Sequence, residues 1–189
     1  MGNVIDQIDR AVDMTAEIVA GIRPNHLTAP SPCTGWTVRD ELNHLVGGMR
    51  IFAAELTGTD AGAGHDADWV GTDPQTAYAT AATLDRAAWN RPAALASTVR
   101  LGFGTVPGPM AALIHLTEVV VHGVDLAVVT DQEHAVDHRL CDDLLAVMRG
   151  MDFDAFRRPG MFGPEALPSI GSPAHRRLLA FAGRELQPS

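Results

Sequence analysis

The chain has 189 residues, of which 46% are hydrophobic and 20% charged, and its formal net charge is −9 with a pI near 5.2. This apolar fraction excludes an intrinsically disordered chain, and the acidic balance argues against binding to a nucleic-acid backbone. No run of eighteen uninterrupted apolar residues occurs, and the N-terminal stretch carries four acidic residues. We therefore expect a cytoplasmic protein without a membrane span or targeting segment, folded as one domain over residues 1–189.

The first half of the chain predicts three helices. Apolar residues at helical spacing predict the first over residues 4–22. A loop rich in Pro, Ser and Gly follows at 28–36. Thr37, with Asp40 three residues later, then predicts a capped helix that ends near residue 56. Asp73 and Pro74 have the chemistry of an N-cap and a first helical position, so a third helix is expected to about residue 89.

The second half predicts one long helix flanked by shorter elements. Residues 97–106 alternate as in a short hairpin or extended segment, and a Pro-Gly-Pro break precedes a long helix that ends near residue 130. A shorter helix fits 137–151, an irregular tail 157–173, and one or two helical turns 175–183. Four main helices with short connections predict an all-α fold, an antiparallel four-helix bundle with a hairpin or extended segment and an irregular C-terminal tail.

The long helix carries four ionisable residues within an otherwise apolar sequence. His115, Glu118, His122 and Asp125 are spaced by three, four and three residues, so they fall within roughly 80° of one helix face. The remaining positions are apolar almost all the way round, which predicts a central, buried helix. Ionisable groups inside a bundle are costly unless something satisfies them. The face therefore predicts either a metal site or a buried ion pair between Glu118 and His122.

A second helix supplies a matching imidazole, His44. Two imidazoles and a carboxylate, His44, Glu118 and His122, suit zinc in a site with three protein ligands and one open position. Nickel, iron and manganese are alternatives that the ligand types leave open. Asp125 or His115 would orient a ligand imidazole, and Asp125 is in addition a candidate for accepting a proton beside the metal.

The other histidines and both cysteines have simpler interpretations. Cys33 precedes a helix, where a thiolate is favoured, but beside Pro32 we expect it to serve packing. Cys33 and Cys141 form no CxxC pair and fit a reducing compartment. Five histidines lie in polar sequence and are expected at the surface: His26, His65, His134, His138 and His175.

With these residues the sequence resembles the DinB-like metal-binding superfamily, in particular the small actinobacterial members related to the N-terminal domain of mycothiol-dependent maleylpyruvate isomerase. The resemblance rests on the order of several segments along most of the chain: PCTGWTVRD at 32–40, LNHLVGG at 42–48, FGTVPG at 103–108, HL at 115–116, VHGVDLA at 121–127, FGP at 162–164 and RLLAF at 177–181. It implies a four-helix bundle that holds a divalent metal, usually zinc, at His44, Glu118 and His122.

The resemblance also implies a class of reaction. Its members use mycothiol, a low-molecular-weight thiol, in isomerisation or in sulfur transfer to a small electrophile, which would be the partners of this chain. A non-catalytic metal- or ligand-binding stress protein and a metal-dependent hydrolase are alternatives. Arg100, in the predicted hairpin, is a candidate for binding an anionic substrate group. Bundles of this kind often pair through helix faces, so a homodimer is an alternative to a monomer.

Overall fold

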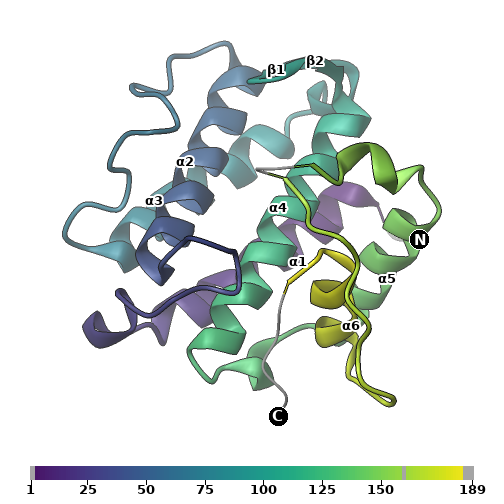
Figure 1. Ribbon diagram of the computed structural model, residues 1–189. Helices are drawn as coiled ribbons and strands as arrows, with labels where there is room; N and C mark the ends of the chain where they lie inside the picture. Colours follow the sequence, from purple (N-terminus) through teal and green to yellow (C-terminus); the bar gives the residue numbers. More distant parts are fainter. Residues whose placement is uncertain (1–2, 159–160, 185–189) are drawn as a thin grey trace.

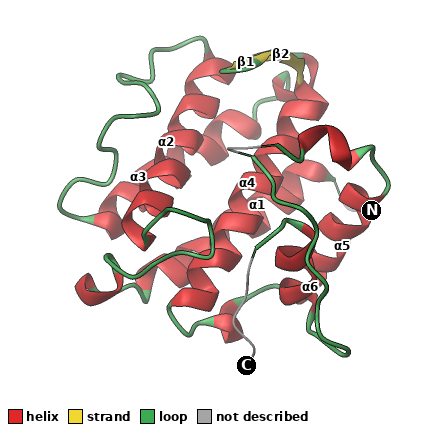
Figure 2. Cartoon of the chain, viewed as in Figure 1, coloured by secondary structure: helices red, strands yellow, loops and turns green. Residues whose placement is uncertain are grey.

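A computed structural model describes residues 3–158 and 161–184, and within them the chain is mostly helical with one two-stranded sheet (Figures 1 and 2). The structure is consistent with the predicted all-α fold and contains the short hairpin. Residues 159–160 of the predicted tail and the C-terminal residues 185–189 lie outside the described part. The helices are α1 (Val4–Ala20), α2 (Val38–Thr57), α3 (Pro74–Trp89), α4 (Gly108–Val129), α5 (His138–Arg149) and α6 (Ala174–Phe181).

The first four helices pack around a common core. α1 lies against α4 and α3, while α2 lies against α3 and α4. Local chemistry sets the predicted starts of two of these helices. The Thr37 side chain accepts the backbone N–H of Asp40, whose carboxylate accepts the N–H of Thr37 in return, and Asp73 caps α3 in front of Pro74. At Gly123 an added Cβ would lie 2.3 Å from the Thr15 hydroxyl, so glycine permits the close approach of α4 to α1.

The remaining elements close two sides of this core. The antiparallel strands β1 (Thr98–Leu101) and β2 (Gly104–Pro107) form the hairpin, which contacts α2 and α4 at one end of these helices (Figure 1). The shorter helices α5 and α6 pack against each other, and both contact α4. Residues 161–173, which precede α6, form a loop that runs along the outside of the helices (Figure 2).

Helix α4 is the central element, and it is more apolar than the sequence criterion indicated. By length and composition it is apolar enough to cross a membrane, with a mean hydropathy of 1.7 over its most apolar window. The sequence criterion of eighteen uninterrupted apolar residues missed it because the ionisable residues interrupt the run. In the structure 72% of this window is buried inside the protein, so packing in the core accounts for the apolar composition.

Candidate metal centre

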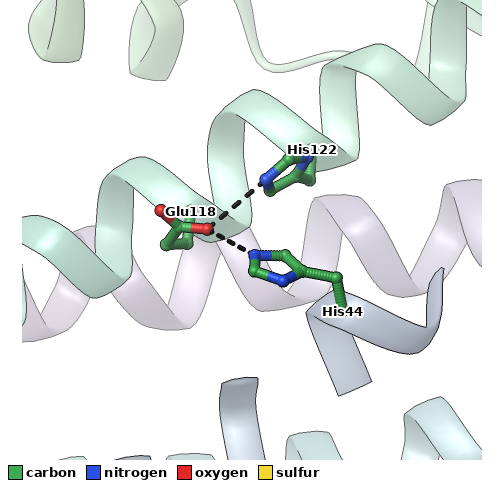
Figure 3. A group of neighbouring side chains, drawn as sticks. All are labelled: His44, Glu118 and His122. Carbon is green, nitrogen blue, oxygen red and sulfur yellow. Dashed lines mark hydrogen bonds and ion pairs between the residues drawn. The ribbon is translucent and has the colours of Figure 1, made fainter. Parts of the chain in front are cut away.

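Three predicted ligands converge between α2 and α4. Glu118 Oε2 lies 2.9 Å from His44 Nε2 and 3.3 Å from His122 Nε2, so one carboxylate oxygen lies between two imidazoles (Figure 3). The three residues each offer a ligand atom within 4.8 Å of the other two. His122 is buried, whereas the His44 and Glu118 side chains are about one-third exposed, at 33% and 34%. The cluster is therefore anchored in the core and open on one side.

A fourth residue, Glu41, fixes the orientation of His122, and the sequence analysis did not assign it this role. Glu41 is fully buried, and its Oε1 lies 2.7 Å from His122 Nδ1. Its other carboxylate oxygen accepts a hydrogen bond of 2.6 Å from the Ser31 hydroxyl. Because Nδ1 bonds to Glu41, the imidazole presents Nε2 to Glu118 and to the open side. Carboxylates orient metal-bound histidines in the same way. The available signal was spacing, because Glu41 lies one turn before His44 on α2.

Asp125 lies next to this group but is held from another direction. Its Oδ2 is 2.9 Å from Arg184 Nε and 3.7 Å from His122 Nδ1, so Glu41 is the nearer partner of His122. Burial and the neighbouring Glu41 carboxylate raise the pKa of Asp125 well above its ordinary value, although Arg184 and His122 act in the opposite direction. Glu41, His122 and Asp125 form a second group with ligand atoms close together. The guanidinium of Arg184 disfavours a cation there, so the open side of His122 is the better position for a metal.

Two further predicted residues have their partners outside this cluster. His115 is bonded through Nε2 to Asp85 Oδ2 at 2.9 Å, so the expected orienting contact with a ligand imidazole is not made. Arg100 pairs with Glu55 at 3.2 Å; its side chain is 78% exposed, and it is not among the residues lining the cavity described below. The partner of His115 is thus on α3, and the partner of Arg100, Glu55, is on α2.

The electrostatics of the cluster favour a charged pair. Burial would raise the pKa of Glu118, but hydrogen bonds from His122 and His44 hold it well below its usual value. Burial would lower the pKa of His122, but hydrogen bonds to Glu118 and Glu41 raise it well above the ordinary imidazole value. Without a metal, His122 therefore holds its proton more tightly than a free imidazole does. A cation that binds here has to displace that proton, which makes binding dependent on pH.

The cluster opens into a cavity of about 960 Å³ between the hairpin, α2, α4 and the C-terminal segment. Trp36 stacks on His122 with ring centroids 5.7 Å apart. Among the described lining residues Glu118 is the one carboxylate, whereas three arginines contribute positive charge, which favours anionic groups in an otherwise acidic protein. The apolar wall is formed by Trp36, Leu45, Met49, Phe52, Leu101, Phe103, Ile114, Val119, Val121, Met161 and Phe162.

Several other residues lie as expected, with one exception. Cys33 and Cys141 are both free, and burial raises the pKa of the Cys33 thiol, in agreement with a packing role. His65 and His134 are exposed as predicted. The prediction for His175 was wrong, because its side chain is buried against Glu133 and His138 at the start of α6.

The fold and the site together define a class of protein: largely helical, with a His–Glu–His cluster in a cavity. The chain belongs to the family of the mycothiol maleylpyruvate isomerase N-terminal domain, whose model matches residues 8–127. This confirms the relation inferred from the sequence segments. Two uncharacterized proteins from strains of Mycobacterium tuberculosis are each 31% identical over 179 residues, covering 94% of this chain and 96% of the relative.

A solved structure is also similar in part. It is the crystal structure of a mutant of mycothiol-dependent maleylpyruvate isomerase, with 14% sequence identity and a TM-score of 0.48. The match covers 74% of this chain and 66% of the solved one.

Proposed function

We propose that this protein binds a divalent metal ion, zinc in the first place, at His44, Glu118 and His122, and that it acts on a low-molecular-weight thiol in the adjoining cavity. The convergence of three ligand atoms from two helices within 4.8 Å carries the proposal. Two imidazoles and one carboxylate with one side open match a catalytic zinc site. The hydrogen bond that His122 Nδ1 donates to Glu41 supports it, since such a partner raises the basicity of a ligand imidazole.

We propose a thiol as the substrate because of the family and because of the chemistry of the three ligands. When bound, zinc lowers the pKa of a thiol in its open position and so makes the sulfur nucleophilic at neutral pH. The chain's own residues supply positioning. Glu41 holds the His122 ring, Trp36 covers its face, and the apolar wall of the cavity excludes water from the sulfur.

The reaction that we propose is isomerisation of a small electrophile or sulfur transfer to it, with mycothiol as the expected thiol. A cavity of about 960 Å³ has room for a thiol and a second small molecule together. Arg158, at the edge of this cavity, forms no ion pair with a described residue and is the better candidate than Arg100 for attracting an anionic group. The cytoplasm, where thiols stay reduced, is the compartment that this chemistry needs.

A thiol-transfer assay tests this function. Purified protein is supplied with mycothiol, or N-acetylcysteine as a simpler thiol, and a halobimane as electrophile, and the fluorescent thioether is measured. We expect turnover that a chelator abolishes and zinc restores. His44→Ala should lose it, and His134→Ala, an exposed histidine away from the cavity, should keep it.

Three other outcomes would contradict the proposal. Tight thiol binding without product would indicate a binding protein. Turnover of an ester or amide substrate without added thiol would indicate a hydrolase. Thioether formation unaffected by chelator would exclude the metal.

A further inference from the structure

A second pair of ionisable side chains lies at the wall of the same cavity. His115 of α4 and Asp85 of α3 are joined by a hydrogen bond of 2.9 Å between Nε2 and Oδ2. The side chains are 1% and 0% exposed, respectively. The rings of Phe52 and Trp89 flank the imidazole, with centroids 4.6 and 5.4 Å from it. The pair is therefore enclosed by apolar groups and separate from the His44–Glu118–His122 cluster.

This pair lowers the stability of the folded protein. No described residue hydrogen-bonds to the other Asp85 oxygen, Oδ1, or to Trp89 Nε1, and both atoms are buried. A buried carboxylate oxygen without a hydrogen-bond partner destabilises the folded state. An apolar pair of similar size would join α3 to α4 without that cost. The retained pair is therefore more than helix packing requires.

One nitrogen of His115 has no hydrogen-bond partner among the described residues, and the residue lines the cavity. His115 is among the cavity-lining residues, and Asp85 occupies Nε2. No described residue hydrogen-bonds to Nδ1, which an ionised Asp85 leaves unprotonated because it accepts the Nε2 proton. His115 precedes Glu118 by three residues, about 4.5 Å along the helix and on the same face. A molecule bound beside the metal cluster thus lies within reach of a second, differently held imidazole.

We infer that His115, held by Asp85, is the proton acceptor for a substrate in this cavity. The identity of that substrate rests on the proposed function, whereas the role itself involves none of the metal ligands. Nδ1 takes a proton from an acidic C–H or O–H of the electrophile, and the imidazolium keeps its Nε2 hydrogen bond to Asp85, whose carboxylate balances the new charge. The same proton is then returned to another atom of the substrate or to the leaving group. No oxidant, reductant or further reactant is consumed. The substrate class is a small carbonyl compound with an exchangeable proton.

Reaction with diethyl pyrocarbonate, which acylates unprotonated imidazole nitrogens, tests directly whether Nδ1 can be reached from the cavity. The modified sites are mapped by peptide mass spectrometry on the wild-type protein. His175 is the matched control, since it is 2% exposed, lies outside the cavity and has both ring nitrogens engaged. We expect His115 to react at least about tenfold faster than His175, since general bases must be reachable by their substrates. Equal or slower reaction at His115 would overturn the assignment and leave a packing role.

Variants test the role in turnover. His115→Ala should lower isomerisation of a carbonyl substrate with an exchangeable proton about 100-fold, the usual contribution of a general base, with metal content unchanged. Added imidazole, which fits the space left by the side chain, should restore part of the rate without a matching gain in melting temperature, and wild type in the same imidazole is the control. Asp85→Asn should lower the rate while keeping the helix contact.

The two proposals fail separately. Labelling is measured without turnover or metal, so unreactive His115 excludes the proton acceptor alone. Wild-type protein that takes up no metal excludes the proposed function alone. Rate loss in His115→Ala that imidazole does not relieve, with a melting temperature that falls in parallel, would contradict the proton-acceptor role.

Discussion

Two clusters in this protein have the same composition, two histidines and one glutamate, and different geometry. At the cavity, Glu118 lies between His44 and His122, and all three offer atoms to one point. At the junction of α5 and α6, Glu133 contacts Nε2 of His175, whereas His138 contacts Nδ1. The two partners of His175 therefore lie on opposite sides of its ring and cannot share an ion.

The difference shows that convergence, and not composition, makes a candidate metal site. Among the described residues, the ligand atoms of the cavity cluster all lie within 4.8 Å of one another, and those of the junction cluster do not. At the junction, Arg176 also pairs with Glu133 at 2.6 Å and neutralises the carboxylate that a cation would need. We interpret the junction cluster as a contact that holds α6, and the cavity cluster as a site for a ligand.

The largest effect short of deleting a ligand is expected at Glu41. Glu41→Gln keeps the size of the side chain and all three ligands, but removes the charge behind His122. Loss of such a partner typically lowers metal affinity about 10- to 100-fold. Competition with a chromophoric chelator measures the change. Unchanged affinity would mean that Glu41 serves only the loop through Ser31.

A smaller effect is expected from the junction cluster, and it depends on pH. Burial lowers the pKa of His175 below 6.5, more than the hydrogen bond to Glu133 raises it. The folded protein thus binds this proton less tightly than the unfolded chain, so stability is full above pH 6.5 and falls as the pH drops through the lower folded value. The neighbouring charged groups, His138, Glu133 and Arg176, belong to the same contact.

His175→Gln should flatten this acid-side loss of melting temperature, where each kcal/mol corresponds to about 2–4 °C. Thermal melts at several pH values compare it with His134→Gln, which replaces an exposed histidine. A wild-type melting temperature that is independent of pH on the acid side, or the same decline in His175→Gln, would refute this interpretation of the junction.

The smallest effect is expected at Arg100. Its ion pair with Glu55 is exposed, and such pairs contribute about 0–1 kcal/mol. Arg100→Ala should therefore leave both thioether formation and melting temperature nearly unchanged. Arg158→Ala is the variant to compare with Arg100→Ala, because Arg158 lines the cavity. A marked loss of activity in Arg100→Ala would return this residue to the site.

The sequence predicted the helices and the ligand trio because both follow from local patterns. Caps at Thr37 and Asp73 mark helix starts, and spacing places Glu118 and His122 on one face of an apolar helix. His44 was joined to them as the imidazole on a second predicted helix, and the resemblance to the family implied the same trio.

The residues around the trio could not be predicted in the same way, because they are supplied by distant segments. In the sequence, Glu41 is an acidic residue in the first turn of a helix, where it interacts favourably with the helix dipole whatever its other partner is. Asp85 meets His115 only once α3 and α4 have both packed into the common core. Arg184 reaches Asp125 across 59 residues. His175 looked solvated because its neighbours in sequence are polar, while its contacts in space come from the preceding segment.

Metal content is the most direct measurement of the central claim. Protein purified without an affinity tag is analysed for its elements as wild type, as His122→Ala and as His138→Ala, which removes a histidine from the junction cluster. The account predicts about one zinc ion per chain in wild type and in His138→Ala, and nearly none in His122→Ala. Stoichiometric zinc in His122→Ala, or wild-type protein that neither carries zinc nor takes it up, would contradict it.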